Sequence, residues 1–112
     1  MTSRKIKRLQ RKWIAEGAES DLGLWWPADD VRDQLGPMAT EEEVRRETLA
    51  ALTPLLRSGQ LRAVDLEHGG GYTEWLGSPD SHLERINTEW QALGRPPTIG
   101  DIVWFIGPRG GP

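Results

Sequence analysis

The sequence predicts an α+β domain in which about four helices pack on a small antiparallel sheet. Apolar residues recur at helical spacing in four separate segments. Two strand-like runs flank a glycine-rich turn, and a further strand-like run lies close to the C-terminus. The expected order is helix, helix, helix, hairpin, helix, strand, an arrangement in which helices cover one sheet. The 112 residues suit a single domain, which we expect to span residues 1–106, with residues 107–112 as a flexible tail.

The first predicted helix covers residues 4–16 and is strongly basic. Ile6, Leu9 and Trp13 fall at i, i+3 and i+7, one apolar stripe of a helix that Gly17 is expected to end. Its remaining faces carry six cations: Arg4, Lys5, Lys7, Arg8, Arg11 and Lys12. The pattern fits both a helix docked on the domain and a free arm.

Two further helices are expected before the hairpin. Pro27 suits the first turn of a short helix that Gly36 and Pro37 would stop. Thr40 to Glu43 matches a capping box at the start of a longer helix, which Gly59 would end. Pro54 lies inside that second pattern, so we expect a kink there or a break into two pieces.

The C-terminal half is expected to supply the sheet and the fourth helix. Residues 61–66 and 72–76 would pair as an antiparallel hairpin around the turn of residues 68–71. Ser78 and Pro79 would start a helix whose apolar stripe ends near Gly94. Residues 101–106 read as the final buried strand.

The sequence contains few residues suited to catalysis, to covalent cross-linking or to metal binding. The chain has no cysteine, which excludes disulfides, thiol catalysis and cysteine-ligated zinc. Two histidines without a matching nucleophile do not suit a triad or most metal sites, so we expect no enzyme activity, cofactor or metal. No apolar run is long enough to span a membrane and no secretory signal is evident, which favours the cytoplasm.

The charge is divided unevenly along the chain, which has a net charge of −3. Residues 1–12 carry six positive charges, whereas residues 13–112 carry eight Lys and Arg against seventeen Asp and Glu, a net charge of −9. An acidic surface steers association with basic partners. We therefore expect a protein–protein interaction module with an acidic binding face, anchored by one of two adjacent tryptophans. Its candidate residues are Trp25, Trp26, Asp29, Asp30, Asp33, Glu41, Glu42 and Glu43.

A nucleic-acid-binding role is the alternative. The order of helices followed by a hairpin is that of a winged helix, with residues 44–58 as recognition helix and residues 61–76 as wing. The wing carries Arg62 against Asp65, Glu67 and Glu74, so contact with phosphates would depend on the six basic residues between Arg4 and Lys12. A solvated helix packed by its apolar stripe and an anionic membrane surface are the other interpretations of this segment.

The segment from Thr40 to Phe105 resembles small bacterial toxin-immunity proteins of unassigned biochemistry. The similarity lies in EEEVRRETLAALTPLLRSGQLRAVDL, then GYTEW, then SPDSHLERINTEWQALGRPPTIGDIVWF. It carries no catalytic residue to transfer, and the basic first helix lies outside it. The resemblance implies a small bacterial cytoplasmic binding protein that neutralises a partner by occlusion. The acidic charge of residues 13–112 adds the expectation that this partner is a basic toxin or effector.

Overall fold

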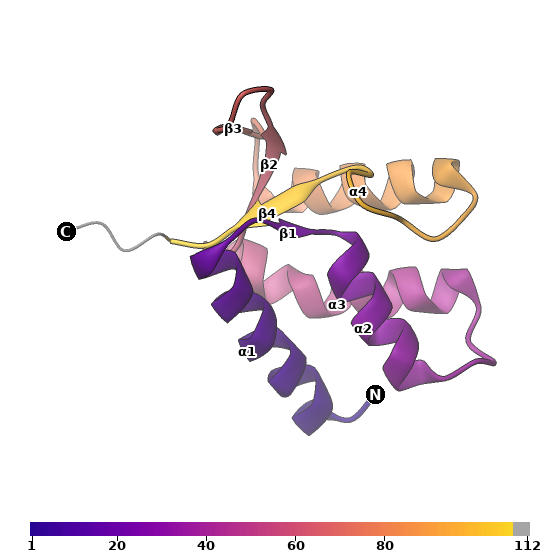
Figure 1. The fold of residues 1–112 in the computed structure, drawn as a ribbon. Coiled ribbons are helices and arrows are strands. Elements are labelled where there is room, and N and C mark those ends of the chain that lie inside the picture. Colours follow the sequence, from indigo (N-terminus) through magenta and orange to yellow (C-terminus); the bar gives the residue numbers. More distant parts are fainter. Residues whose placement is uncertain (109–112) are drawn as a thin grey trace.

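Four helices and four short strands make up the computed structural model, which describes residues 1–108 (Figure 1). In chain order they are α1 (Ser3–Glu19), β1 (Leu22–Gly23), α2 (Trp25–Leu35), α3 (Glu41–Arg57), β2 (Arg62–Leu66), β3 (Tyr72–Glu74), α4 (Pro79–Leu93) and β4 (Trp104–Ile106). The predicted α+β class and the predicted order of helices, hairpin, helix and strand are confirmed. No helix within these residues is both long and apolar enough to cross a membrane.

The strands form one antiparallel sheet in the order β1-β4-β2-β3. β4 lies in the middle of the sheet, where Phe105 pairs with Leu22 of β1 and Ala63 of β2. β3 is an open edge whose three residues are exposed. In the view of Figure 1, α1, α2 and α3 lie below the sheet, and the β2–β3 hairpin projects upward from it.

α3 is the central helix of the fold because it packs against α1, α2 and α4. Thr40 caps it as predicted: the Thr40 hydroxyl accepts from the Glu43 backbone N–H, and the Glu43 carboxylate accepts from the Thr40 backbone N–H. The helix is continuous through Pro54, so the predicted break does not occur. Pro54 removes only the hydrogen bond that its N–H would donate to the Ala50 carbonyl, and Ala50 is exposed, so water can solvate that carbonyl.

Gly17 does not end the first helix, contrary to the sequence prediction. The helix continues for two more residues to Glu19, and Gly17 is buried where α1 crosses the sheet. A Cβ atom on Gly17 would lie 2.6 Å from a Leu61 methyl group and 3.2 Å from the Gly107 nitrogen. The Gly107 N–H donates to the Gly17 carbonyl at 2.8 Å, so Gly107 belongs to the fold and not to the predicted tail. Residues 109–112 of that tail lie outside the described residues.

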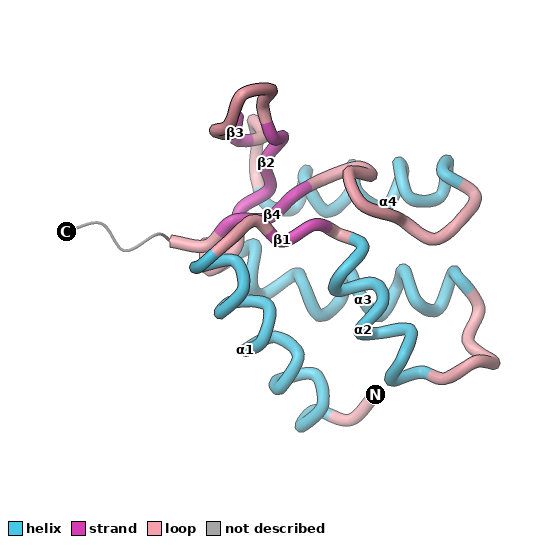
Figure 2. The backbone as a smooth tube through the Cα atoms, in the orientation of Figure 1, coloured by secondary structure: helices cyan, strands magenta, loops and turns pink. Residues whose placement is uncertain are grey.

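The final strand is shorter than the predicted 101–106 because a tight turn occupies its first positions. The Asp101 carboxylate accepts hydrogen bonds from the Thr98 backbone N–H and from Arg95, both at 2.8 Å. Ile102 then adopts φ +67°, which a β-branched residue rarely does and which a strand does not allow. Figure 2 shows the loop between α4 and β4 that results.

Asp101 gives this turn a measurable pH dependence. The hydrogen bond from Arg95, followed by that from the Thr98 N–H, lowers the pKa of Asp101 to about 2. Because the folded pKa lies below the unfolded one, this stabilisation is complete above the unfolded pKa and disappears as the pH falls towards 2. We expect Asp101→Asn to lower the free energy of unfolding at pH 7 by about 1 kcal/mol, since solvent screens the pair. Urea unfolding at pH 7 and at pH 2 measures this; an equal loss at both pH values would contradict it.

Candidate functional site

The basic segment is a docked helix and not a free arm. Thr2 caps α1 by accepting a hydrogen bond from the Lys5 backbone N–H. Leu9 and Trp13 are buried in the core, and the Gln10 side-chain amide donates to the Ala51 carbonyl of α3 at 2.9 Å. These contacts fix the position of the helix and leave its opposite face open to solvent.

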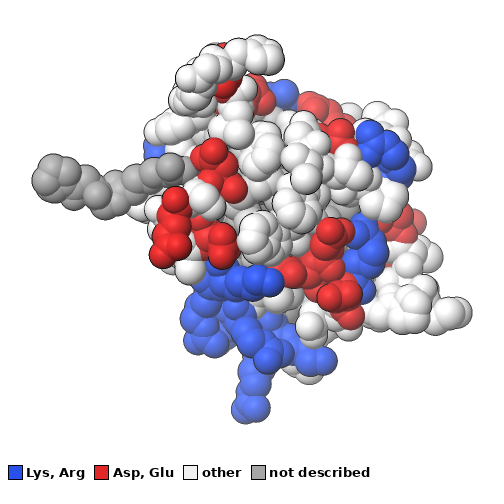
Figure 3. Space-filling view, in the orientation of Figure 1, with Lys and Arg blue, Asp and Glu red and all other residues white. Residues whose placement is uncertain are grey.

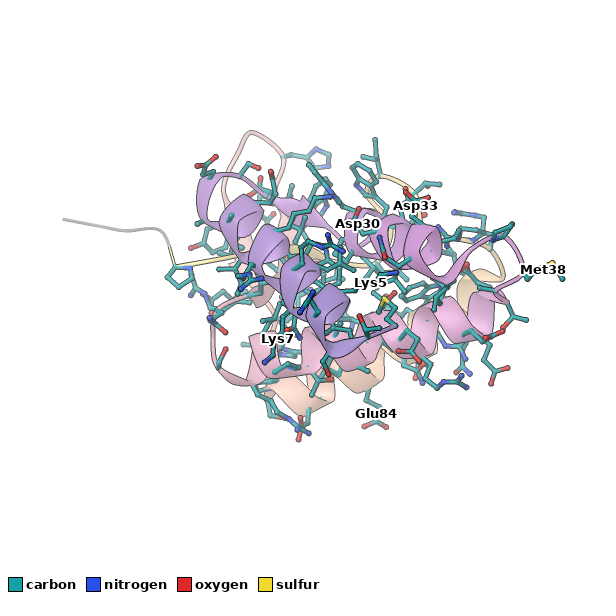
Figure 4. The ribbon with its side chains drawn as sticks, turned by 90° about the horizontal axis from the view of Figure 1, so that it is seen from below. Lys5, Lys7, Asp30, Asp33, Met38 and Glu84 are labelled. Atoms are coloured by element: carbon teal, nitrogen blue, oxygen red, sulfur yellow. The ribbon has the colours of Figure 1, made fainter. Side chains whose placement is uncertain are left out.

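All six cations lie on that open face. Arg4, Lys5, Lys7, Arg8, Arg11 and Lys12 are exposed, and Figure 3 shows blue side chains gathered over α1 at the lower edge of the molecule. Figure 4 shows Lys5 and Lys7 on the two sides of the helix. We call these six residues the cationic face.

The cationic face is almost free of internal ion pairs. Only Lys12 has one within residues 1–108, with Asp30 at 3.1 Å. The first turn of α1 contains no acidic residue, so Arg4 and Lys5 lie next to the positive end of the helix dipole. Mutual repulsion and the dipole both disfavour this placement, which is the kind of local conflict expected at a binding site.

The predicted acidic face is brought together in part, and three of its six carboxylates form ion pairs with two cations, Arg32 and Lys12. Arg32 binds Asp29 at 2.6 Å and Glu41 at 2.7 Å, which links α2 to the start of α3. Asp30 is half-buried and accepts from the Trp13 indole N–H at 2.9 Å as well as pairing with Lys12.

The remaining acids of that face differ in their surroundings. The hydrogen bond from the Thr40 backbone N–H lowers the pKa of Glu43, which serves the capping box. Asp33 and Glu42 are exposed and make no ion pair within the part of the chain that the structure describes. Two of the six predicted acids are therefore open to a partner.

The two adjacent tryptophans pack on one another. Their ring centroids lie 5.6 Å apart with the planes at 29°, and both side chains are half-buried. Trp25 covers Gly23, where a Cβ would lie 2.7 Å from the indole nitrogen. Lys12 lies 5.8 Å from the centroid of Trp26, so the tryptophan pair adjoins the cationic face. The sequence analysis expected one tryptophan at the surface, whereas the structure exposes part of each.

The recognition helix predicted for a winged-helix mode is largely covered. α3 packs against three helices, and its exposed residues form a narrow stripe of Glu42, Arg46, Ala50, Pro54 and Arg57. A helix that reads a DNA groove needs a wide free face. The cationic face of α1, and not α3, is the surface open to an anion.

The histidines have structural surroundings. His68 is exposed in the hairpin turn, whereas His82 places its Nε2 2.8 Å from the Leu76 carbonyl and meets the Trp75 ring edge-on. No cluster of three or more histidines and carboxylates with the geometry of a metal site lies within residues 1–108.

Comparisons with known proteins leave the family open. No protein-family model, no curated protein sequence and no solved structure matches the chain. The resemblance to toxin-immunity proteins therefore stays a prediction, and the function must be argued from the surfaces described above.

Proposed function

We propose that this protein is a non-catalytic binding module whose cationic face holds the phosphate backbone of a nucleic acid. One observation supports this most strongly: unpaired positive charge is concentrated on α1. Five of its six cations have no ion pair among the described residues, whereas five of the seven described cations elsewhere are paired, Arg45 and Arg46 being the exceptions.

The composition of the face favours backbone contacts over base contacts. The large apolar residues of α1 turn away from this face: Trp13 and Leu9 are buried, and Ile6 and Ile14 are half-buried against the core. No ring is therefore available on α1 for stacking on bases. Gln10, whose amide is suited to an adenine edge, is bound to Ala51. We therefore expect binding that depends on charge and little on sequence. The lack of exposed apolar side chains among the cations also disfavours insertion into a membrane.

A fluorescence anisotropy titration of a labelled 20-base-pair duplex in 50 mM salt tests this proposal. We expect a dissociation constant of roughly 1–100 μM at physiological salt, as for other non-specific binders, and tighter binding in 50 mM salt. Two duplexes of unrelated sequence should bind equally. Anionic vesicles and an acidic protein of matched charge density are the competing probes; binding to either in preference to the duplex would contradict the proposal.

A second proposal retains the acidic partner-binding face, because the half-exposed tryptophan pair has the composition of an interface anchor. In this case the protein binds a basic toxin or effector in the bacterial cytoplasm, through Trp26 with Asp33 and Glu42. Both proposals agree that the protein acts by binding and not by catalysis.

The two unpaired acids provide the test of this second proposal. We expect Asp33→Asn with Glu42→Gln to weaken binding to a basic toxin encoded by a neighbouring gene about tenfold, mainly through slower association. Glu84→Gln is the control, because Glu84 is an exposed acid on α4 that Figure 4 shows on a different side from Asp33. Calorimetry and stopped-flow association rates measure the effect, and equal effects of the two variants would rule out this face.

A further inference from the structure

A hollow of about 320 Å³ lies between the hairpin, the end of α3 and the start of α4. Its floor is apolar and consists of Leu56, Leu61, Ala63 and Trp75, all of which are buried. No residue of α1 or α2 lines it, so the hollow is separate from both surfaces discussed above. An apolar depression of this size suits a hydrophobic side chain.

A suitable side chain lies at its border. Leu76 is 94% exposed, the largest exposure among the large hydrophobic residues of the described chain. Its neighbours Trp75 and Gly77 both line the hollow, whereas Leu76 itself does not. Its backbone is held in place, because His82 bonds to the Leu76 carbonyl at 2.8 Å. The chain therefore presents a fixed apolar knob directly beside an apolar hole.

Three charged residues line the rim of the hollow: Arg57, Arg62 and Glu74. Arg57 pairs with Asp80 at 2.8 Å, just outside the lining, and Arg62 pairs with Glu74, so each cation at the rim has an anion beside it. A strongly acidic or strongly basic partner gains little net electrostatic attraction from such a rim. A second copy of the same surface meets it without net repulsion, since each pair has a cation and an anion to offer.

We propose that two copies of the chain associate through this surface about a two-fold axis, each placing Leu76 in the hollow of the other. A two-fold interface uses the same patch on both copies, so a knob can fill a hole across it only if the knob and the hole lie on that one patch. Here the two are adjacent, and one axis close to Leu76 serves both contacts. The patch is small, so the dimer is weak, with a dissociation constant of roughly 10–100 μM.

Sedimentation velocity from about 5 to 500 μM is the first test, with the concentrations chosen to bracket that constant. The wild type should pass from monomer to dimer across this range, and Leu76→Asp should remain monomeric. Met38→Asp is the matched control: Met38 is 91% exposed, lies between α2 and α3 and does not line the hollow, so this variant should dimerise normally. A wild type that is monomeric throughout, or a Leu76→Asp variant that dimerises as the wild type does, would overturn the proposal.

Cross-linking separates knob-in-hole contact from any other mode of association. The chain has no cysteine, so a single Leu76→Cys chain mixed with a single Ser58→Cys chain has one thiol on the knob and one on the wall of the hollow. Under mild oxidation this mixture should give mixed disulfide dimers at least fivefold faster than a mixture of Met38→Cys and Ser58→Cys. Equal rates would overturn the proposed geometry. Dimerisation does not involve α1, so it should persist in variants that no longer bind nucleic acid.

Discussion

Changing Arg4, Lys5 and Arg8 together to glutamine should weaken binding to duplex DNA in 50 mM salt by about two to three orders of magnitude. The estimate follows from counterion release, in which each phosphate contact contributes a factor that grows as the salt concentration falls. The three side chains are exposed and have no ion pair within the described residues, so their loss removes nothing that supports the fold.

The same triple variant should be more stable than the wild type, although it binds DNA more weakly. Arg4 and Lys5 lie in the first turn of α1, where the helix dipole disfavours cations, and Arg8 is four residues from Arg4 and three from Lys5. Removing three mutually repelling charges should raise the free energy of unfolding by about 0.5–1.5 kcal/mol. Weaker binding with higher stability is a combination that damage to the fold does not produce.

A variant of equal charge provides the control. Arg46→Gln, Arg57→Gln and Arg85→Gln removes an equal number of positive charges from exposed positions on α3 and α4, of which Arg57 and Arg85 are ion-paired with Asp80 and Glu89. We expect its affinity for the duplex to fall by less than about threefold, because only long-range attraction changes. If both triple variants lost affinity equally, net charge and not the cationic face would govern binding.

Trp13→Ala should be the most destabilising single change in the molecule. Trp13 is fully buried, and its indole N–H donates to Asp30, which also pairs with Lys12. Removal of a buried tryptophan costs about 3–5 kcal/mol, a large share of the 5–15 kcal/mol that stabilises a typical domain. The midpoint of thermal unfolding should fall by about 15 °C.

Two companion variants separate packing from hydrogen bonding. Trp13→Phe retains most of the packing but leaves Asp30 without the indole donor, so we expect a loss of about 1–2 kcal/mol. Trp26→Ala, at a half-exposed position, should cost less than Trp13→Ala. Urea unfolding followed by circular dichroism measures all three. A loss below 1 kcal/mol for Trp13→Ala would mean that α1 does not depend on the core for its position.

The helices were predictable because their signals are local. The Thr40 capping box and the Ser78–Pro79 start are fixed by residues within one turn, and both appear as predicted. β1 was not predicted, since its two residues are too few to show any periodicity. The error at Gly17 has another cause: a glycine that ends a helix and a glycine that lets a neighbour approach look the same in sequence.

For the candidate site, the sequence indicates which residues take part but not which of them form ion pairs. The six cations and the exposed helical face they share follow from the spacing of Leu9 and Trp13. The partial ion pairing of the acidic face does not, because Lys12–Asp30 and Arg32–Glu41 join elements whose contact is set by tertiary packing. Only the Asp29–Arg32 ion pair could be predicted from the sequence, because these two residues are three apart on one helix. Ion pairs leave the net charge of residues 13–112 at −9, so the acidic binding face stays a prediction.

The dependence of duplex affinity on salt tests the role of α1 most directly. If the five unpaired cations and Lys12 each neutralise a phosphate, a plot of log K against log salt concentration should have a slope of about −5 for the wild type. The Arg4, Lys5 and Arg8 glutamine variant should give about −3. A wild-type slope near zero, or an identical slope for the two proteins, would show that the cationic face does not contact nucleic acid.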